Sequence, residues 1–166
     1  MTSATEKIQS SPTECILHGK WDLYYHLPND KNWDLSSYKI INKDISKICD
    51  LISLNESVSE KIVKYCMLFV MRSGITPMWE DPKNRNGGSF SYKVSNKNVC
   101  EVWRELNYVL VGETISNTSS FVNCVTGITI SPKKNFCIIK IWMSNCDNQN
   151  PANVTTEVKG LIPQGC

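Results

Sequence analysis

Residues 74–88 read Gly-Ile-Thr-Pro-Met-Trp-Glu-Asp-Pro-Lys-Asn-Arg-Asn-Gly-Gly, and the interpretation of the whole chain starts from them. The prolines, glycines and Asp/Asn side chains are typical of a long connection between strands. Trp79 and Glu80 stand in its middle, and Trp33 stands in a second polar, turn-forming segment. A tryptophan in such a loop either anchors the loop to the core or offers a flat apolar face to a ligand.

Short β-prone runs separated by turn residues flank both loops, and they look like one sheet. We expect strands at Lys20–His26, Tyr38–Asp44, Cys66–Met71, Ser89–Val94, Val122–Ile130 and Phe136–Met143. Apolar residues at helical spacing predict a clear amphipathic helix and two weaker ones. These are Asn98–Val111, which Gly112 ends, followed by Ile45–Leu54 and Ala152–Leu161. Helices between antiparallel strands predict an α+β fold in which one face of the sheet is covered and the other is open.

The composition predicts a single domain and a local ligand site. A chain of 166 residues with 41% hydrophobic residues suits one domain over residues 17–166, preceded by a flexible N-terminal tail over residues 1–16. Its 18 basic and 16 acidic side chains nearly cancel, so the strongly basic face of a general nucleic-acid binder is not expected. No stretch approaches membrane-spanning length, and we expect a monomer without a membrane partner.

The cysteine pattern argues against a metal site and against export. None of the eight cysteines forms a C-x-x-C pair or stands beside a histidine at zinc-like spacing. The first residues carry no basic segment followed by an apolar run, so no secretory signal is expected. We therefore expect a reducing compartment, the cytoplasm or also the nucleus, in which the cysteines are small buried hydrophobic residues.

Four runs, in order and spacing, resemble the eukaryotic translation initiation factor 4E family, which binds the 5′ cap of mRNA. They are Trp33, residues 74–88, Val111-Gly112-Glu113 and Ile139-Lys140-Ile141-Trp142, and the resemblance extends over residues 17–163. It identifies the chain as a divergent member. The family fold would be one curved antiparallel sheet of about eight strands, with three helices on the convex face and a cap slot on the concave face.

The resemblance implies a ligand site for 7-methylguanosine, with no cofactor, metal or catalytic residue. Trp33 and Trp79 would stack on the base, Glu80 would accept the guanine N1 and N2 hydrogens, and Trp142 would touch the N7-methyl group, with Met78 in the same site. Methylation at N7 makes the base cationic, so two indole faces gain a cation–π attraction that ordinary guanine does not supply. The ligand would be the cap itself or 7-methyl-GTP.

The phosphates of the cap need cations, and here the family pattern is only partly kept. Lys133 matches the family arginine, whereas Ile138 replaces a lysine. Lys134 and Lys140 are further candidates, and strand alternation puts Lys140 on the face shared by Ile138 and Trp142. We hypothesise that Lys140 compensates for Ile138, while a solvated surface role suits Lys134 at least as well.

The family's helical back binds a short helical peptide of the scaffold factor 4G or of 4E-binding proteins, and here this surface differs. Asp50 stands where the family has a tryptophan and Ser46 where it has a valine. Arg104 and Tyr108 replace two leucines, and only Glu105 matches. A helix-in-groove contact depends on apolar anchors, so we expect the usual peptide to bind poorly. Besides capped mRNA, the partner would be a divergent 4G-like scaffold or another protein at this surface.

Four functional readings follow from these residues. The first is a cap-binding protein in translation initiation or its control, and the second is a cap-binding repressor that competes with factor 4E. The third is a 4E-like protein-interaction module without cap binding. The fourth, an enzyme acting on the cap, is not expected because no glutamate cluster or nucleophile–base pair is present. His18 and His26 are interpreted as ordinary residues at strand ends.

Overall fold

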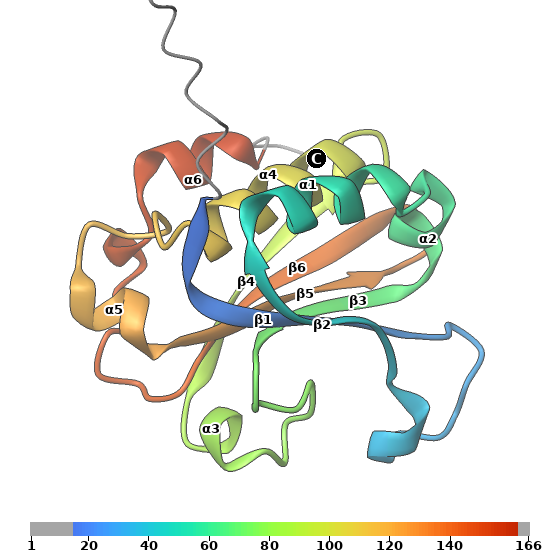
Figure 1. The fold of residues 1–166 in the computed structure, drawn as a ribbon, viewed down its shortest axis with the longest axis horizontal. Coiled ribbons are helices and arrows are strands. Elements are labelled where there is room, and N and C mark those ends of the chain that lie inside the picture. The colour runs from blue at the N-terminus through green and yellow to red at the C-terminus, as the bar shows by residue number, and fades with distance from the viewer. Residues whose placement is uncertain (1–14, 163–166) are drawn as a thin grey trace, which may run out of the picture.

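The computed structural model describes residues 15–162, and their centre is one six-stranded antiparallel sheet (Figure 1). The strand order is β2-β1-β3-β5-β6-β4. The strands are β1 (Ile16–His26), β2 (Lys39–Lys47), β3 (Met67–Arg72), β4 (Gly88–Ser95), β5 (Val125–Pro132) and β6 (Phe136–Met143). All six expected runs contribute to this sheet, which confirms the α+β class, and the described residues supply six strands where the family pattern suggested about eight. The expected tail lies outside the described residues except for its last two, and β1 begins at Ile16.

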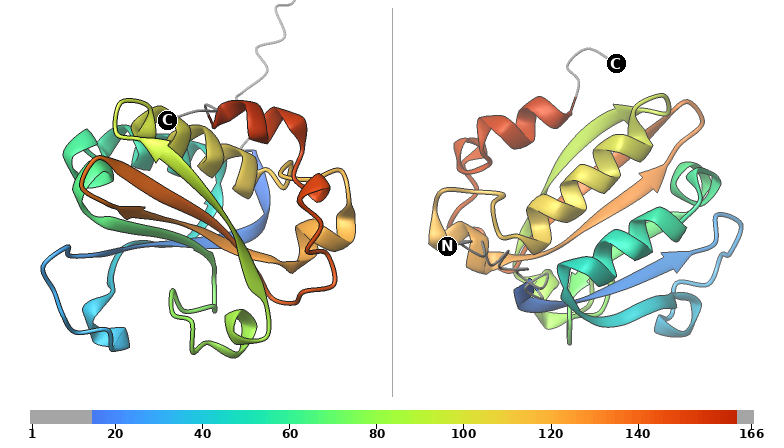
Figure 2. Two further views of the ribbon diagram at one scale, coloured as in Figure 1. Left: turned by 180° about the vertical axis from the view of Figure 1, so that it is seen from behind. Right: turned by 45° about the horizontal axis from the view of Figure 1, so that its top comes forward.

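Three helices lie over one face of the sheet (Figures 1 and 2): α1 (Ile48–Ser57), α4 (Val99–Val111) and α6 (Thr156–Leu161). Further short elements lie in the connections between strands: α2 (Glu60–Tyr65), α3 (Pro82–Arg85), α5 (Ser119–Cys124) and the 3₁₀ turn η1 (Leu35–Ser37). A second 3₁₀ turn, η2 (Pro151–Asn153), lies between β6 and α6. The amphipathic helix is confirmed, and Gly112 is its C-cap. Its apolar stripe packs on the sheet, so the main core fills the space between the two layers.

Strand β6 shows how the sheet separates the core from the open face. Cys137, Ile139, Ile141 and Met143 are buried, whereas the alternating residues Ile138, Lys140 and Trp142 are half-buried. Successive side chains of a strand point to opposite faces, so these three residues share the face away from the helices. The predicted placement of Lys140 beside Ile138 and Trp142 is confirmed.

Several element boundaries differ from expectation, and β1 begins at Ile16 where Lys20 was expected. The helix expected from Ile45 begins at Ile48, because Ile45 is paired with Trp21 in the sheet and buried there. The strand expected from Val122 begins at Val125, because residues 119–124 form α5. A short apolar run does not distinguish a buried helical turn from a strand.

The helix expected over residues 152–161 is divided into η2 and α6. Pro151 opens η2, and the Thr155 side chain then accepts a hydrogen bond from the backbone N–H of Val158, 3.3 Å away. That contact is an N-cap, so a new helix begins at Thr156. The expectation of a single helix was wrong because two N-terminal signals stand close together.

The face of the sheet away from the helices has a smaller apolar cluster of its own. Tyr24, Phe69 and Met71 are buried there, with Tyr38 and Ile75 packed against them. Two long connections extend from this side in both ribbon views (Figures 1 and 2). We call them the Trp33 loop (residues 27–38, between β1 and β2) and the Trp79 loop (residues 73–87, between β3 and β4).

Candidate functional site

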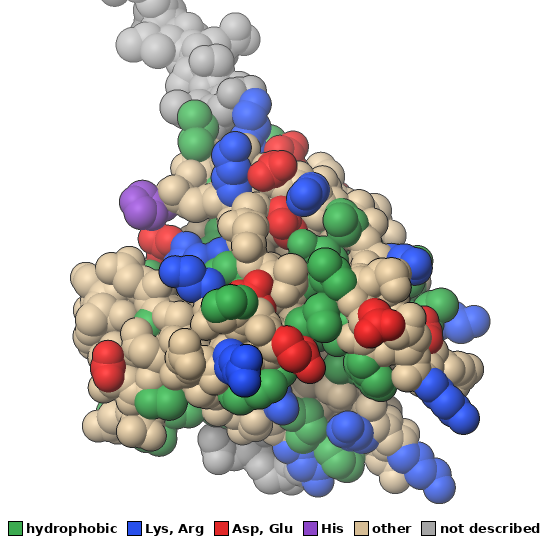
Figure 3. All heavy atoms as spheres, turned by 90° about the horizontal axis from the view of Figure 1, so that it is seen from below, with side chains coloured by type: hydrophobic (Ala, Val, Ile, Leu, Met, Phe, Trp, Pro, Cys, Tyr) green, Lys and Arg blue, Asp and Glu red, His purple; other side chains and the backbone are tan. Residues whose placement is uncertain are grey.

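The two loops carry the most exposed tryptophans among the described residues. The exposed fraction is 53% for Trp33 and 49% for Trp79. Seen from the loop side, apolar side chains are exposed in the middle of the surface, and lysine and arginine side chains lie at several places around them, interspersed with acidic ones (Figure 3). An exposed aromatic group bordered by cations suits a flat ligand that carries negative charge.

Trp33 packs against two aromatic rings, one at the end of β1 and one at the end of its own loop. Its ring stacks on the ring of His26, with centroids 4.2 Å apart and an interplanar angle of 2°. Tyr38 contacts the same pair, 6.4 Å from Trp33 and 5.1 Å from His26 between ring centroids. The sequence predicted Trp33 as a ligand ring but interpreted His26 only as a residue at a strand end. His26 does end β1, and it is fully buried.

Trp79 and Trp142 lie together on the other side of the site. Their ring centroids are 5.7 Å apart at an angle of 51°, and the Trp142 indole N–H donates to Thr129 Oγ1 over 3.1 Å. Trp142 is therefore held in place by β5, while Trp79 remains half exposed. Two of the three predicted rings are in contact. The ring contacts of Trp33 are with His26 and Tyr38.

Glu80 follows Trp79 and is exposed. Burial raises the pKa of the Tyr38 hydroxyl, and the negative charge of Glu80 raises it further, which places Glu80 within electrostatic reach of the Trp33 loop. Met78 precedes Trp79 in the loop. Its backbone carbonyl accepts a hydrogen bond from the Asp81 N–H over 3.3 Å. An exposed carboxylate on the Trp79 loop can accept hydrogen bonds from a bound base.

Two further side chains shape the Trp79 loop, and the sequence reasoning assigned them no role. The Asp81 carboxylate accepts from Thr76 N and Oγ1, at 2.8 and 2.9 Å, and from Lys83 N at 2.9 Å. Burial by itself would raise the pKa of the Asp81 carboxyl, but the hydrogen bonds from Thr76 and Lys83 outweigh it, so the pKa lies below its usual value.

Asn84 is almost completely buried and makes three hydrogen bonds. Its amide donates to Thr76 O at 3.1 Å and to Met78 O at 2.8 Å, and its carbonyl oxygen accepts from Thr126 Oγ1 at 2.8 Å. It thereby connects both halves of the loop to β5. Asn84 belongs to residues 74–88, which carry the family resemblance, so the sequence could have drawn attention to it. Its role in holding the loop is revealed only by these contacts.

The end of the Trp79 loop runs directly against β6. A Cβ atom at Gly87 would overlap the backbone carbonyl of Met143, so a residue without a side chain is required there. The loop therefore returns to the sheet beside Trp142, one residue before Met143. This close approach brings Trp79 and Trp142 to the same part of the open face.

Two of the three predicted phosphate-binding lysines line a groove together with Trp142. A groove of about 270 Å³ is lined by Lys133, Lys140, Trp142, Ile138, Thr129, Ser131, Met67 and Phe69. The Lys140 ammonium lies 5.6 Å from the centroid of the Trp142 ring. Lys133 and Lys140 thus share a groove with Trp142. Lys134 is exposed in the turn between β5 and β6 and does not line this groove.

The predicted partner surface lies on the opposite, helical side. Asp50 is exposed in the first turn of α1, where a negative charge favours the helix N-terminus, and Ser46 lies on β2 rather than on the helix. On α4, Arg104 is exposed and Glu105 is half-buried, with Arg104 Nε 3.9 Å from Glu105 Oε1. Tyr108 packs partly against the core. The residues at these positions are mostly polar.

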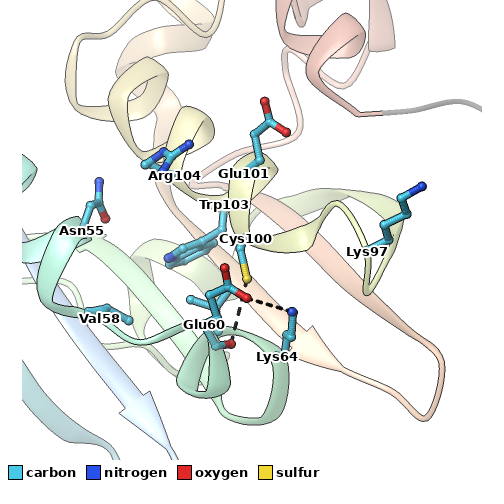
Figure 4. Close-up of a pocket in the computed structure, with 10 residues that line it drawn as sticks. Asn55, Val58, Glu60, Lys64, Lys97, Cys100, Glu101, Trp103 and Arg104 are labelled. Atoms are coloured by element: carbon cyan, nitrogen blue, oxygen red, sulfur yellow. Dashed lines mark hydrogen bonds and ion pairs between the residues drawn. The ribbon is translucent and has the colours of Figure 1, made fainter.

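A hollow of about 260 Å³ adjoins this surface, between α1, α2 and α4 (Figure 4). The Trp103 ring forms one wall, and the ion pair between Lys64 Nζ and Glu60 Oε2, 3.0 Å apart, lies at its rim with Arg104. Within residues 15–162, no group of three or more His, Cys, Asp or Glu side chains is placed to hold a metal ion. In the same range, no helix is long and apolar enough to cross a membrane.

Comparison with known proteins gives matches over the whole described domain. The family model for eukaryotic initiation factor 4E matches residues 16–162. The 4E homolog of Acanthamoeba polyphaga mimivirus is 36% identical over 165 residues, covering 87% of this chain and 57% of the relative. Factor 4E-2 of Schizosaccharomyces pombe is 29% identical, covering 81% of this chain and 56% of the relative. The chain thus spans a little over half the length of these two relatives.

Solved structures agree with the fold. A complex of C. elegans eIF4E-3 with the 4E-binding protein Mextli has a TM-score of 0.78 at 19% identity and covers 93% of this chain and 90% of that one. A schistosome eIF4E complexed with m7GpppA and a 4E-BP has a TM-score of 0.72 at 26% identity, with coverages of 82% and 75%. Because the family model matches nearly all described residues and the fold agrees, this chain belongs to the eukaryotic initiation factor 4E family.

Proposed function

We propose that this chain binds the 7-methylguanosine cap of mRNA and acts in translation initiation or its control. The observation that carries the proposal is the placement of two half-exposed tryptophans on loops of the same open face, next to Glu80 and a groove with two lysines. Trp33 and Trp79 would enclose the methylated base between them. The ring of Trp142, which already contacts Trp79, would lie near the methyl group.

The physical basis is attraction between a cationic base and electron-rich rings. Each stacked ring contributes ~1–3 kcal/mol in comparable base platforms, and a cation–π attraction adds ~0.5–2 kcal/mol for the methylated base. The Glu80 carboxylate would accept two hydrogen bonds from the guanine edge and face a positive charge, which strengthens both bonds. The site therefore favours the methylated form through charge as well as shape.

Lys133 and Lys140 would hold the phosphates. Ile138 lies between them along the groove and brings an aliphatic side chain where the family resemblance suggests a lysine. Lys140 is on the same face two residues further along β6, so its ammonium would replace the missing cation. With fewer cations in the site, cap affinity should depend less on salt than is usual for a triphosphate ligand.

The test is a titration with 7-methyl-GTP and with GTP, followed by tryptophan fluorescence. We expect quenching by the methylated nucleotide at concentrations where GTP has little effect. Trp33→Ala should weaken binding by about 10- to 100-fold, which corresponds to the loss of one stacked ring. Glu80→Gln should weaken it too, whereas Glu101→Gln, on the exposed side of α4, should leave it unchanged.

Equal affinity for the two nucleotides would refute cap binding and leave a protein-interaction role on the same fold. A second candidate within the cap-binding class is a repressor that occupies caps without recruiting the usual scaffold. The polar residues Asp50 and Arg104 on the helical side favour it, because a helical peptide needs apolar anchors there. Addition of the protein to a cap-dependent translation extract would then lower the amount of protein made from capped mRNA, but not the amount made from uncapped mRNA.

A further inference from the structure

The open face continues along β6 beyond the lysine groove. Strand alternation puts Phe136, at the start of β6, on the same face as Lys140 and Trp142. Phe136 is half-buried and does not line the groove. At ~3.3 Å per residue, it lies about 20 Å from Trp142 along the strand. A triphosphate bridge is shorter than that, so this part of the face lies beyond the phosphates of a bound cap.

Lys93 of the neighbouring strand β4 lies over the Phe136 ring. Its ammonium nitrogen is 4.8 Å from the ring centroid. Strand β4 runs antiparallel beside β6 (Figure 2), with Lys93 opposite Ile138 and Ser95 opposite Phe136, so Lys93 and Phe136 are diagonal neighbours on one face. Lys93 is exposed, and among residues 15–162 no carboxylate forms an ion pair with it. Its charge is therefore available to an anion.

The strands that form this part of the face carry only positive charge. Lys93 and Lys140 are the charged side chains of β4, β5 and β6, whose residues are all described, and the turn between β5 and β6 adds two further lysines. Ser91 on β4 and Thr129 on β5 flank Lys140 and bring hydroxyl groups. Cations, hydroxyl groups and an aromatic ring on one open face suit a single-stranded nucleic acid, whose backbone follows the cations while its bases stack on rings.

We propose that Lys93 and Phe136 bind the first nucleotides of the RNA chain that follows the cap. Lys93 pairs with a backbone phosphate, and the Phe136 ring stacks on a base. The proposal rests on the proposed cap function, because a base enclosed by Trp33 and Trp79, with its phosphates at Lys140, directs the rest of the RNA along β6 toward Phe136.

The contact between Lys93 and Phe136 is exchanged when the RNA binds. An exposed contact between an ammonium group and a ring is weak, whereas a hydrogen bond from an ammonium group to a phosphate is assisted by charge on both partners. Lys93 therefore leaves the ring for the phosphate, and the uncovered ring receives a base. Before binding, the same contact holds the lysine side chain over the open face, so less side-chain freedom is lost on binding.

The test compares two ligands that share the methylated base, both followed by tryptophan fluorescence. One is 7-methyl-GTP, which ends at the triphosphate, and the other is the capped tetra-adenylate m7GpppAAAA. Lys93→Ala should weaken binding of the capped tetra-adenylate by about 3- to 10-fold and reduce its slope of log affinity against log salt concentration by about 0.7, the value for one phosphate contact on a single strand. The affinity for 7-methyl-GTP should change by less than about twofold, because that ligand does not reach Lys93.

Phe136→Leu tests the ring, since leucine keeps an apolar side chain without a flat face. It should weaken the capped tetra-adenylate by about 5- to 10-fold, the lower end of what one stacked base contributes, and leave 7-methyl-GTP unchanged. A purely structural role would affect both ligands, because damage to β6 would also reach Trp142. Lys159→Ala, on α6 in the helical layer, removes the same charge from the other side and should leave both affinities unchanged.

Equal weakening of both ligands would overturn the proposal, and so would an unchanged affinity for the capped tetra-adenylate in either variant. An uncapped tetra-adenylate 5′-triphosphate separates this proposal from the cap function. Equal affinities for 7-methyl-GTP and GTP would refute the cap function, and weaker binding of the uncapped tetra-adenylate by Lys93→Ala would still support the RNA contact. Selective binding of 7-methyl-GTP, with the same affinity for the capped tetra-adenylate in wild type and Lys93→Ala, would refute only the RNA contact.

Discussion

Asn84 connects the Trp79 loop to the sheet, and Asn84→Ala measures how much that connection contributes. The substitution removes three hydrogen bonds, two to loop carbonyls and one from Thr126, at distances of 2.8 to 3.1 Å. At about 1 kcal/mol for each bond, the loss is about 3 kcal/mol of unfolding free energy. For a chain of this size, that corresponds to a decrease of about 6–12 °C in the unfolding temperature.

The assay combines urea unfolding with the 7-methyl-GTP titration. We expect a lower unfolding midpoint and weaker nucleotide binding, because Trp79 and Glu80 lie on the loop that Asn84 holds. Asn86→Ala is the control, since Asn86 is exposed in the same loop and should affect neither measurement. An unfolding midpoint equal to that of the wild type would refute the reasoning, because it would mean that water replaces the three hydrogen bonds at no cost.

Three further predictions concern the lysine groove, the Trp79 loop at acid pH and the helical surface. Lys140→Ala should weaken 7-methyl-GTP binding and reduce the slope of log affinity against log salt concentration by about one, whereas Lys134→Ala should change neither; equal slopes would contradict the role of Lys140. The pKa of Asp81 is lowered in the folded state, so its stabilising contribution is present above the unfolded value and is lost as the pH falls through the folded value. The difference in thermal unfolding midpoint between wild type and Asp81→Asn should therefore shrink between about pH 5 and about pH 3; a difference independent of pH would disagree. Asp50→Trp should increase the affinity for a helical 4E-binding peptide, measured by calorimetry, at a cost of about 0.5 kcal/mol from the lost charge at the start of α1; unchanged affinity would show that Asp50 is not the residue that weakens this surface.

Much of the fold follows from local patterns, and the errors occur where local patterns compete. The strand at residues 136–143 is a nearly continuous apolar run, and the helix at residues 99–111 has a clear period of 3.6 residues. Both agree with expectation to within a residue. Ile45 was assigned to a helix although sheet pairing with Trp21 keeps it in β2. Such pairing joins residues far apart in the chain, so it cannot be predicted from the periodicity of one segment.

In the candidate site, too, some residues could be predicted from local patterns and others could not. Strand alternation was enough to place Lys140 beside Trp142. One turn-forming segment was enough to single out Trp33, and residues 74–88 were enough to single out Trp79 and Glu80. Asn84 was part of that segment, but its three hydrogen bonds involve Thr126, 42 residues away. Contacts of that kind depend on how β5 lies under the loop, so they follow from the assembled sheet.

The class of fold, the face of the sheet that carries Lys140 and the residue types available to a ligand could all be predicted from the amino-acid sequence. These depend on side-chain chemistry and on short-range periodicity, both of which are written along the chain. The folded chain was needed to show that Trp33 stacks on His26 and that Trp79 contacts Trp142. The same holds for the two carbonyl oxygens that face the ring nitrogens of His26. A histidine has the same side chain wherever it stands, and its hydrogen-bond partners are the groups that folding brings against it.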